Sequence, residues 1–205
     1  MKILIAVPCM DQVPVHFCQS LALLQKPEAE CQLIMKSGSL IYTARNEIAT
    51  HAIQSGADYV FWLDSDMVFR PDILVKMLKT AQENDIDILT GLYFRRVPPY
   101  TPVLFDKLDI RRNICSWSEF KEIPEGLFEI GGCGFGCVLM ETSVFLSVQA
   151  KHGNMFAPIA NNGEDIAFCW RARDCGYKIM CDPSIICGHV SYSVVDDQFF
   201  KAFKR

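Results

Sequence analysis

The sequence predicts an α/β protein with a central, mostly parallel sheet flanked by helices. Residues 3–7 and 59–63 are uninterrupted apolar runs, which are typical of strands buried on both faces. Segments with helical periodicity separate the strand-like runs over the first ninety residues, and this alternation is typical of parallel sheets. The chain has 205 residues, of which 50% are hydrophobic and 21% are charged, so one domain with a substantial core is expected.

The first elements follow one another without long loops. We expect a strand at 2–7 and a helix that Pro14 opens and Pro27 ends, because proline fits the first turn of a helix but not its interior. A short strand at 32–35 comes next. A helix at 40–56 then keeps its apolar residues on one face and ends at a glycine.

The strand at 59–63 is followed by a helix over 71–81 and a strand at 86–89. From residue 93 to 130 the sequence is rich in proline and aromatic residues, which predicts edge strands and loops. The glycine-rich segment 131–136 is expected to be a flexible hinge.

The last expected elements are a strand at 137–140, a helix at 164–175 and a strand at 184–187. The composition changes near residue 90, but no linker lies there. We therefore expect one domain over 1–205.

Two halves are distinguished within that domain. They are residues 1–92 and residues 93–190, on either side of the change in composition. The tail 191–205 is aromatic and basic, which suits peripheral contact with a membrane surface or a partner. A helix that packs back on the domain is the alternative for this tail.

Charge and hydropathy exclude several classes of protein. The chain has 20 basic and 24 acidic residues, and its net charge of −4 disfavours binding to nucleic acid. No apolar run approaches the ~18 residues of a transmembrane helix, and the N-terminus lacks the layout of a signal peptide. A cytoplasmic protein without a transmembrane segment is expected.

The ten cysteines include no C-x-x-C pair. Structural zinc sites use such tight pairs, and a cytosolic chain of this length has core enough without disulfides. Reduced, mostly buried thiols are therefore expected.

Asp64, Ser65 and Asp66 directly follow the buried strand at 59–63. In open α/β sheets, ligands bind beyond the carboxyl ends of the strands. Two carboxylates one residue apart can hold a hard divalent cation against phosphate oxygens. An Asx turn that merely ends the strand is the alternative.

Three further segments carry candidate site residues. Arg45 and Asn46 lie on the helix at 40–56, where an arginine can also be a solvated surface charge. Glu164 and Asp165 begin the helix at 164–175, where acidic residues also stabilise the helix N-terminus. His189 follows the last strand and can be structural or a metal ligand.

In this order, the segments resemble a GT-A-fold glycosyltransferase, in particular the group around glycosyltransferase family 2. The resemblance covers residues 2–190. It is carried by Ile5-Ala6-Val7-Pro8, Ala44-Arg45-Asn46, Val60-Phe61-Trp62-Leu63-Asp64-Ser65-Asp66, Gly134-Phe135-Gly136, Gly163-Glu164-Asp165 and His189. The family's processive polysaccharide synthases differ, because this sequence has no Q-x-x-R-W element.

The resemblance implies metal-dependent transfer of a sugar from a nucleotide-diphosphate sugar to the hydroxyl of a saccharide, lipid or protein acceptor. It implies a divalent metal, with Mn²⁺ favoured and Mg²⁺ tolerated. The implied metal ligands are Asp64, Asp66 and His189. The resemblance further implies that residues 1–92 are a nucleotide-binding half and residues 93–190 an acceptor and catalytic half. The residues expected to bind the nucleotide sugar are Pro8, Cys9, Asp11, Arg45, Asn46, Asp64 and Ser65.

The resemblance also implies that the acid of the Glu-Asp pair is the general base in inverting enzymes. We expect Asp165 in this role, ionised by its place at a helix N-terminus. Glu164 is the competing candidate, because helix neighbours point about 100° apart and only one is expected to face the site.

Other functional classes are left open. A non-catalytic sugar-nucleotide or carbohydrate-binding module would share the fold but needs neither Asp165 nor His189. An Asp-x-Asp phosphatase usually carries its motif after the first strand, followed by Gly-Thr, whereas here the motif follows Leu63. Dinucleotide binding is disfavoured, since no G-x-G-x-x-G occurs.

Overall fold

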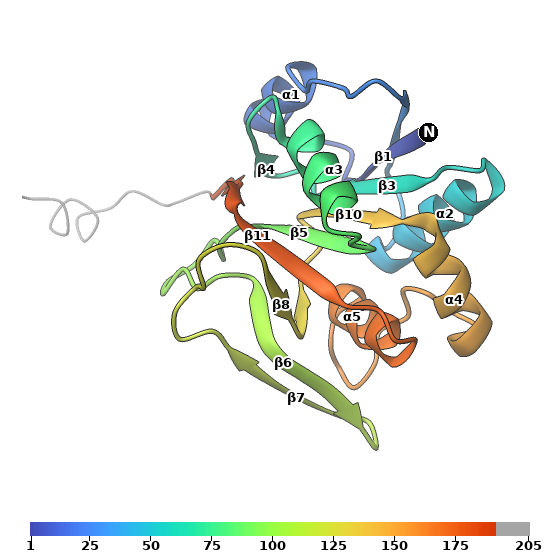
Figure 1. Ribbon diagram of the computed structural model, residues 1–205, viewed down its shortest axis with the longest axis vertical. Coiled ribbons are helices and arrows are strands. Elements are labelled where there is room, and N and C mark those ends of the chain that lie inside the picture. The colour runs from blue at the N-terminus through green and yellow to red at the C-terminus, as the bar shows by residue number, and fades with distance from the viewer. Residues whose placement is uncertain (192–205) are drawn as a thin grey trace, which may run out of the picture.

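The computed structural model describes residues 1–191 (Figure 1). Its centre is a seven-stranded sheet with the order β2-β1-β3-β10-β5-β11-β8. β1 (Lys2–Pro8) pairs in parallel with β2 (Glu30–Lys36) and with β3 (Tyr59–Leu63). β5 (Ile88–Leu92) pairs in parallel with β11 (Ile179–Ile186). The predicted α/β class with a mostly parallel sheet is confirmed.

Two strands of this sheet run against the others. β10 (Cys137–Glu141) lies antiparallel between β3 and β5, and β8 (Phe128–Ile130) lies antiparallel to β11 at the edge. Because β10 fills the space between β3 and β5, it also sets the distance between the loops that follow these two strands.

Both faces of the sheet are covered by helices (Figure 1). α1 (Val15–Ala22) and α3 (Ile73–Glu83) pack on one face. α2 (Ile41–Gln54), α4 (Thr142–His152) and α5 (Glu164–Asp174) pack on the other. Alternate residues of β1 and β3 therefore enter two different cores, which explains why residues 3–7 and 60–63 are uninterrupted apolar runs. Within residues 1–191 no helix has the length and apolar character to cross a membrane.

Two small sheets lie beside the central one. β6 (Leu104–Arg111) and β7 (Ile114–Glu119) form a hairpin, and β9 (Gly132–Cys133) pairs with β6. β4 (Met67–Val68) pairs with β12 (Gly188–His189), which joins the turn after β3 to the end of the described chain.

The elements differ from the prediction at a few places. The first helix ends at Ala22, before Pro27. The strand expected at 184–187 is the end of β11, which begins at Ile179 and is interrupted by a register shift after Asp182. α4 was not predicted, and the tail beyond residue 191 lies outside the described residues.

The glycine-rich segment is a packed region, so the predicted flexible hinge is wrong. A Cβ added to Gly134 would lie 2.2 Å from the Tyr93 hydroxyl oxygen, and one on Gly136 would lie 2.7 Å from Tyr93 Cζ. A Cβ on Gly131 would lie 2.7 Å from the backbone nitrogen of Leu108. These glycines permit close approach of neighbouring elements.

All ten cysteines are free thiols. Five are buried, namely Cys133, Cys137, Cys169, Cys181 and Cys187, while Cys18 is exposed and the remaining four are half-buried. The expectation of mostly buried thiols therefore holds for half of them.

Candidate active site

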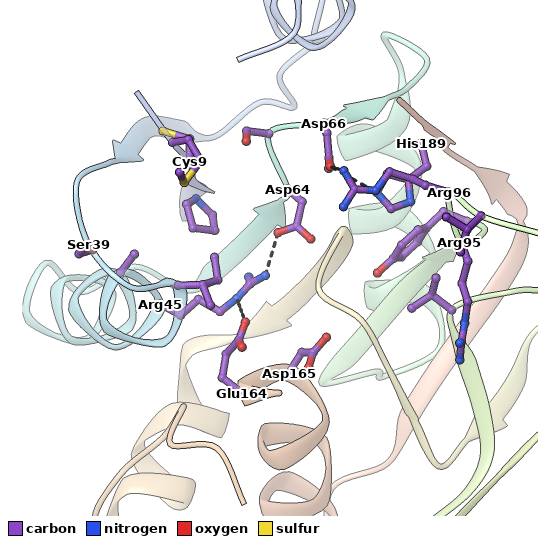
Figure 2. Close-up of a pocket in the computed structure, with 18 residues that line it drawn as sticks. Cys9, Ser39, Arg45, Asp64, Asp66, Arg95, Arg96, Glu164, Asp165 and His189 are labelled. Carbon is purple, nitrogen blue, oxygen red and sulfur yellow. Dashed lines mark hydrogen bonds and ion pairs between the residues drawn. The ribbon is translucent and has the colours of Figure 1, made fainter. Parts of the chain in front are cut away.

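A cleft of about 550 Å³ opens at the carboxyl ends of β1 and β3 (Figure 2). This volume is typical of small-molecule sites. The cleft is lined by residues that follow these strands and β5, and by residues of α2, α5 and β12. They include Pro8, Cys9, Arg45, Asp64, Ser65, Asp66, Tyr93, Arg95, Arg96, Glu164, Asp165 and His189.

The turn after β3 separates Asp64 from Asp66. The backbone N–H of Asp64 donates to Gly136 of the adjacent segment over 3.2 Å, and the N–H of Met67 donates to the Asp64 carbonyl over 3.1 Å. As Figure 2 shows, the Asp64 carboxylate then turns toward α2, whereas Asp66 turns toward His189 and Arg96. The two carboxylates therefore have different partners.

Arg45 of α2 joins two acidic residues in the floor of the cleft. Its Nη2 donates to Asp64 Oδ1 over 2.7 Å and its Nε donates to Glu164 Oε1 over 3.0 Å. The guanidinium also lies over the rings of Trp62 and Phe135, 5.5 and 5.2 Å from their centroids. The alternative that the sequence left open, in which Arg45 is a solvated surface charge, is therefore wrong.

Only 3% of the Arg45 side chain is exposed. Burial alone lowers the pKa of this guanidinium, but the charges of Asp64 and Glu164 outweigh it and raise the pKa above its ordinary value. Arg45 thus stays charged and fixes the positions of two carboxylates from elements far apart in the sequence.

Asp66 and His189 form the second charged pair of the cleft. Pairing of β4 with β12 sets His189 opposite Met67, next to Asp66, and His189 Nε2 lies 3.4 Å from Asp66 Oδ2. Burial raises the pKa of Asp66, but the hydrogen bond and charge of His189 lower it below its usual value. Burial lowers the pKa of His189, but the hydrogen bond to Asp66 raises it overall.

The hydrogen bond on the other side of the His189 ring fixes its tautomer. Nδ1 lies 2.8 Å from the carbonyl oxygen of Phe94, and because a carbonyl only accepts, Nδ1 carries the proton. In the neutral ring, Nε2 therefore presents a lone pair to the Asp66 carboxylate. A proton on Nε2 makes this contact attractive, and a metal ion bound to the same two atoms would take the place of that proton.

These two side chains fit a divalent metal, because carboxylate and imidazole are a donor set that suits Mn²⁺. Asp64, the third predicted ligand, is instead held by Arg45. Within residues 1–191, no group of three or more His, Cys, Asp or Glu side chains gathers in a metal-binding arrangement. A metal here would need its remaining ligands from the substrate and water.

Glu164 and Asp165 begin α5, and both line the cleft. The expectation that only one of them faces the site is therefore wrong. Glu164 pairs with Arg45, while Asp165 Oδ1 accepts from its neighbour's N–H, that of Ile166, over 2.7 Å. This carboxylate folds back over Gly163, whose added Cβ would lie 2.7 Å from it.

Burial, followed by the charge of Glu164, raises the pKa of Asp165 to about 6. This direction is opposite to the prediction that the helix N-terminus keeps Asp165 ionised. The backbone hydrogen bond and Arg45 do lower the pKa, but desolvation is the larger effect.

The structure separates the other predicted nucleotide-binding residues. Pro8, Cys9 and Ser65 line the cleft, whereas Asp11 lies in a neighbouring groove with Gly38. Asn46 does not line the cleft. Its Nδ2 donates to the carbonyl of Tyr42, and its Oδ1 accepts from the N–H of Phe156, so its role is structural.

Tyr93, Arg95 and Arg96 line the cleft but were not predicted. They follow β5 directly, so the rule that ligands bind beyond the carboxyl ends of strands could have indicated them. The prolines that follow predict loops and edge strands and by themselves indicate no binding site.

The sheet, the helices on its two faces and the cleft beyond β1 and β3 define a GT-A fold. Three solved structures are similar to this chain. A197 from STIV matches with a TM-score of 0.61 and 19% identity, over 96% of this chain and 87% of that one. TarS 1–349 from S. aureus in complex with UDP-GlcNAc matches with a TM-score of 0.61 and 14% identity. GalNAc-T7 with UDP, GalNAc and Mn²⁺ matches with a TM-score of 0.65 and 10% identity.

The glycosyltransferases among these structures are longer than this chain. The match covers 98% of this chain but 64% of the TarS chain, and 95% of this chain but 44% of the GalNAc-T7 chain. No protein-family model and no curated protein matches the sequence. The similarity therefore establishes the fold.

Proposed function

We propose that this protein transfers a sugar from a nucleotide-diphosphate sugar to an acceptor hydroxyl and requires a divalent cation, preferably Mn²⁺. The observation that carries the proposal is one cleft that contains both the Asp66–His189 pair and the half-buried acid Asp165. Structures of the same fold that contain UDP-GlcNAc, or UDP with Mn²⁺, support this class of donor.

The metal would bind Asp66 Oδ2 and His189 Nε2. When bound, it supplies positive charge that stabilises the leaving diphosphate. The Phe94 carbonyl holds the His189 ring with Nε2 toward Asp66. Asp64, fixed through Oδ1 by Arg45, would accept a hydrogen bond from the donor ribose through its other oxygen. Pro8 and Cys9 would border the nucleoside.

Asp165 would act as the general base. A carboxyl group with a pKa of about 6 is mostly ionised at neutral pH, yet it accepts a proton better than an ordinary aspartate. It would take the proton of the acceptor hydroxyl while that oxygen bonds to the anomeric carbon. The bond from that carbon to the diphosphate then breaks, and its electron pair leaves with the diphosphate. Attack from the opposite side gives inversion at the anomeric carbon.

The donor's nucleoside and the acceptor would bind to different halves of the chain. The nucleoside of the donor would contact mainly residues 1–92, and the acceptor would enter from the side of residues 93–190. An assay with saccharide, lipid and protein acceptors would identify the chemical class of the acceptor.

The test is release of nucleoside diphosphate from a panel of nucleotide sugars with Mn²⁺, with and without candidate acceptors. We expect release with at least one donor, and loss of that release in Asp66→Ala and Asp165→Asn. Asp72→Asn, on an exposed surface pair, is the matched control. Binding of nucleotide by calorimetry without any turnover would replace this proposal with a non-catalytic binding module.

Proton NMR of the product tests the role of Asp165. An inverted anomeric configuration is expected. Retention would remove the general-base assignment even if the Asp165→Asn variant were inactive.

A further inference from the structure

Backbone contacts of the segment that contains Arg96 hold this residue beside the Asp66–His189 pair. The segment from Phe94 to Arg96 lies alongside the end of the described chain, where His189 bonds to the Phe94 carbonyl and the Ser191 hydroxyl donates to the Arg96 carbonyl over 3.1 Å. The same segment therefore positions the histidine ring and the arginine.

The Arg96 side chain contacts the oxygen that a metal would use. Its Nη1 donates to Asp66 Oδ2 over 2.9 Å, and His189 Nε2 lies 3.4 Å from that same oxygen (Figure 2). A divalent cation on Oδ2 would sit directly against a guanidinium that already neutralises the carboxylate. Because like charges repel at this range, the guanidinium has to leave Oδ2 when the metal binds.

Arg96 is free to make that move without disturbing the core. Its side chain is 51% exposed, in contrast to the 3% exposure of Arg45. It lines the cleft, so a guanidinium released from Asp66 remains next to any anion bound there. A planar guanidinium binds phosphate oxygens with two parallel hydrogen bonds, which makes the donor's diphosphate its natural second partner.

We propose that Arg96 is a diphosphate-binding residue that exchanges Asp66 for the donor's diphosphate when the metal binds Asp66. The inference rests on the proposed function and adds a specific role for a residue outside the recognised motifs. In this proposal, the metal and Arg96 compete for Asp66 Oδ2 when no donor is bound. Once the donor is bound, both of them bind its diphosphate. Loss of Arg96 therefore has opposite effects on the two ligands.

Arg95 provides a matched control for charge. It is the preceding residue, also lines the cleft and has 41% of its side chain exposed, but its Nη2 bonds to Glu119 of β7 over 3.2 Å. Replacing Arg95 by glutamine removes the same charge without freeing Asp66.

The experiment is isothermal titration calorimetry on the full chain, first with Mn²⁺ alone and then with UDP at saturating Mn²⁺. For Arg96→Gln we expect Mn²⁺ to bind about tenfold more tightly and UDP about 10- to 100-fold more weakly, the range for hydrogen bonds to charged groups. Arg95→Gln should shift the Mn²⁺ affinity much less than Arg96→Gln. Arg96→Lys should keep the Mn²⁺ affinity near that of the unmodified chain and weaken UDP, because a lysine retains the charge but not the planar fork. This second variant also serves if Arg96→Gln does not fold.

The proposed exchange of partners by Arg96 is overturned if only one of the two expected changes in affinity is observed. Weaker UDP with unchanged Mn²⁺ affinity in Arg96→Gln would make Arg96 a donor ligand that does not compete with the metal. Tighter Mn²⁺ with unchanged UDP affinity would make it only a counter-ion of Asp66. UDP binding that depends on Arg96 but not on Mn²⁺ would mean that arginine replaces the metal. Failure of the unmodified chain to bind UDP at all would instead refute the proposed function.

Discussion

The guanidinium of Arg45 and the carboxylate of Asp64 meet at 2.7 Å and join α2 to the end of β3 beneath the cleft. Because the same arginine also binds Glu164 at the start of α5, three elements are fixed relative to one another by one buried side chain. The Asp64 carboxylate is thereby held by the protein, and Asp66 is left to interact with His189 and Arg96.

Replacing Arg45 by alanine should lower the stability of the fold. The substitution leaves Asp64 and Glu164 without their shared partner, and breaking a buried ion pair in this way costs about 3–5 kcal/mol. A chain of this length loses about 2–4 °C of melting temperature per kcal/mol, which thermal unfolding followed by circular dichroism would detect. Lys76→Ala, which removes an exposed pair with Asp72, is the control and should cost less than about 1 kcal/mol. A similar, small loss in both variants would contradict the structural role of Arg45.

Asp165→Asn should lower turnover about 10²- to 10⁴-fold, the usual contribution of a general base, with little change in donor affinity. In the unmodified protein, the rate should rise with pH through about 6, where this carboxyl loses its proton. Initial rates from pH 5 to 8 with Mn²⁺ would measure this profile. A rate that does not change across pH 6 would exclude Asp165 as the base.

The same Asp165→Asn substitution should stabilise the protein at neutral pH. The folded pKa of about 6 lies above the ordinary value of 3.8, so the protonated form favours folding and this favourable effect is lost as pH rises from about 4 to 6. The ionised carboxylate therefore costs up to about 3 kcal/mol above pH 6. Denaturant unfolding should show a more stable variant at pH 7.5 and almost no difference at pH 4. Glu164→Gln, which weakens the bond to Arg45, should have the opposite sign at pH 7.5.

Removal of metal by a chelator should abolish activity, and added Mn²⁺ should restore it more effectively than Mg²⁺, since imidazole suits Mn²⁺ better. His189→Ala should raise the Mn²⁺ concentration needed for half-maximal activity by at least about tenfold. His152→Ala is the matched control, because His152 pairs with Asp174 outside the cleft. Full activity in excess chelator would contradict the metal requirement.

Gly134→Ala should destabilise the fold by about 1–3 kcal/mol, the usual effect of an extra methyl group in a packed region. The new Cβ would lie 2.2 Å from the Tyr93 hydroxyl oxygen, so the Tyr93 side chain or the backbone has to move. At Gly188 an added Cβ lies 3.5 Å from Val68 Cβ, an ordinary contact, and Gly188→Ala should change stability little. Equal melting temperatures for the two variants would restore the interpretation of residues 131–136 as a hinge.

Local sequence determined the central strands of the sheet. In β1 and β3 every residue but the first is buried, so an unbroken apolar run was the only pattern that fits two covered faces. It also determined that Asp64 and Asp66 come at the end of β3, since polar residues cannot continue a strand buried on both faces. β11 was predicted less well because Asp182 and Pro183 interrupt its pattern.

Only the tertiary structure decided what the acidic residues contact. Arg45 and Glu164 are 119 residues apart, and Asp66 and Arg96 are 30 apart, so no periodicity of a single element could pair them. The pKa of Asp165 depends on desolvation and on charges from other parts of the chain, and these effects outweighed the local effect of the helix N-terminus. The sequence by itself therefore determined which elements carry the site, because burial and periodicity act over neighbouring residues. The partners and protonation of the site depended on folding, because they arise between elements that only the packed sheet brings together.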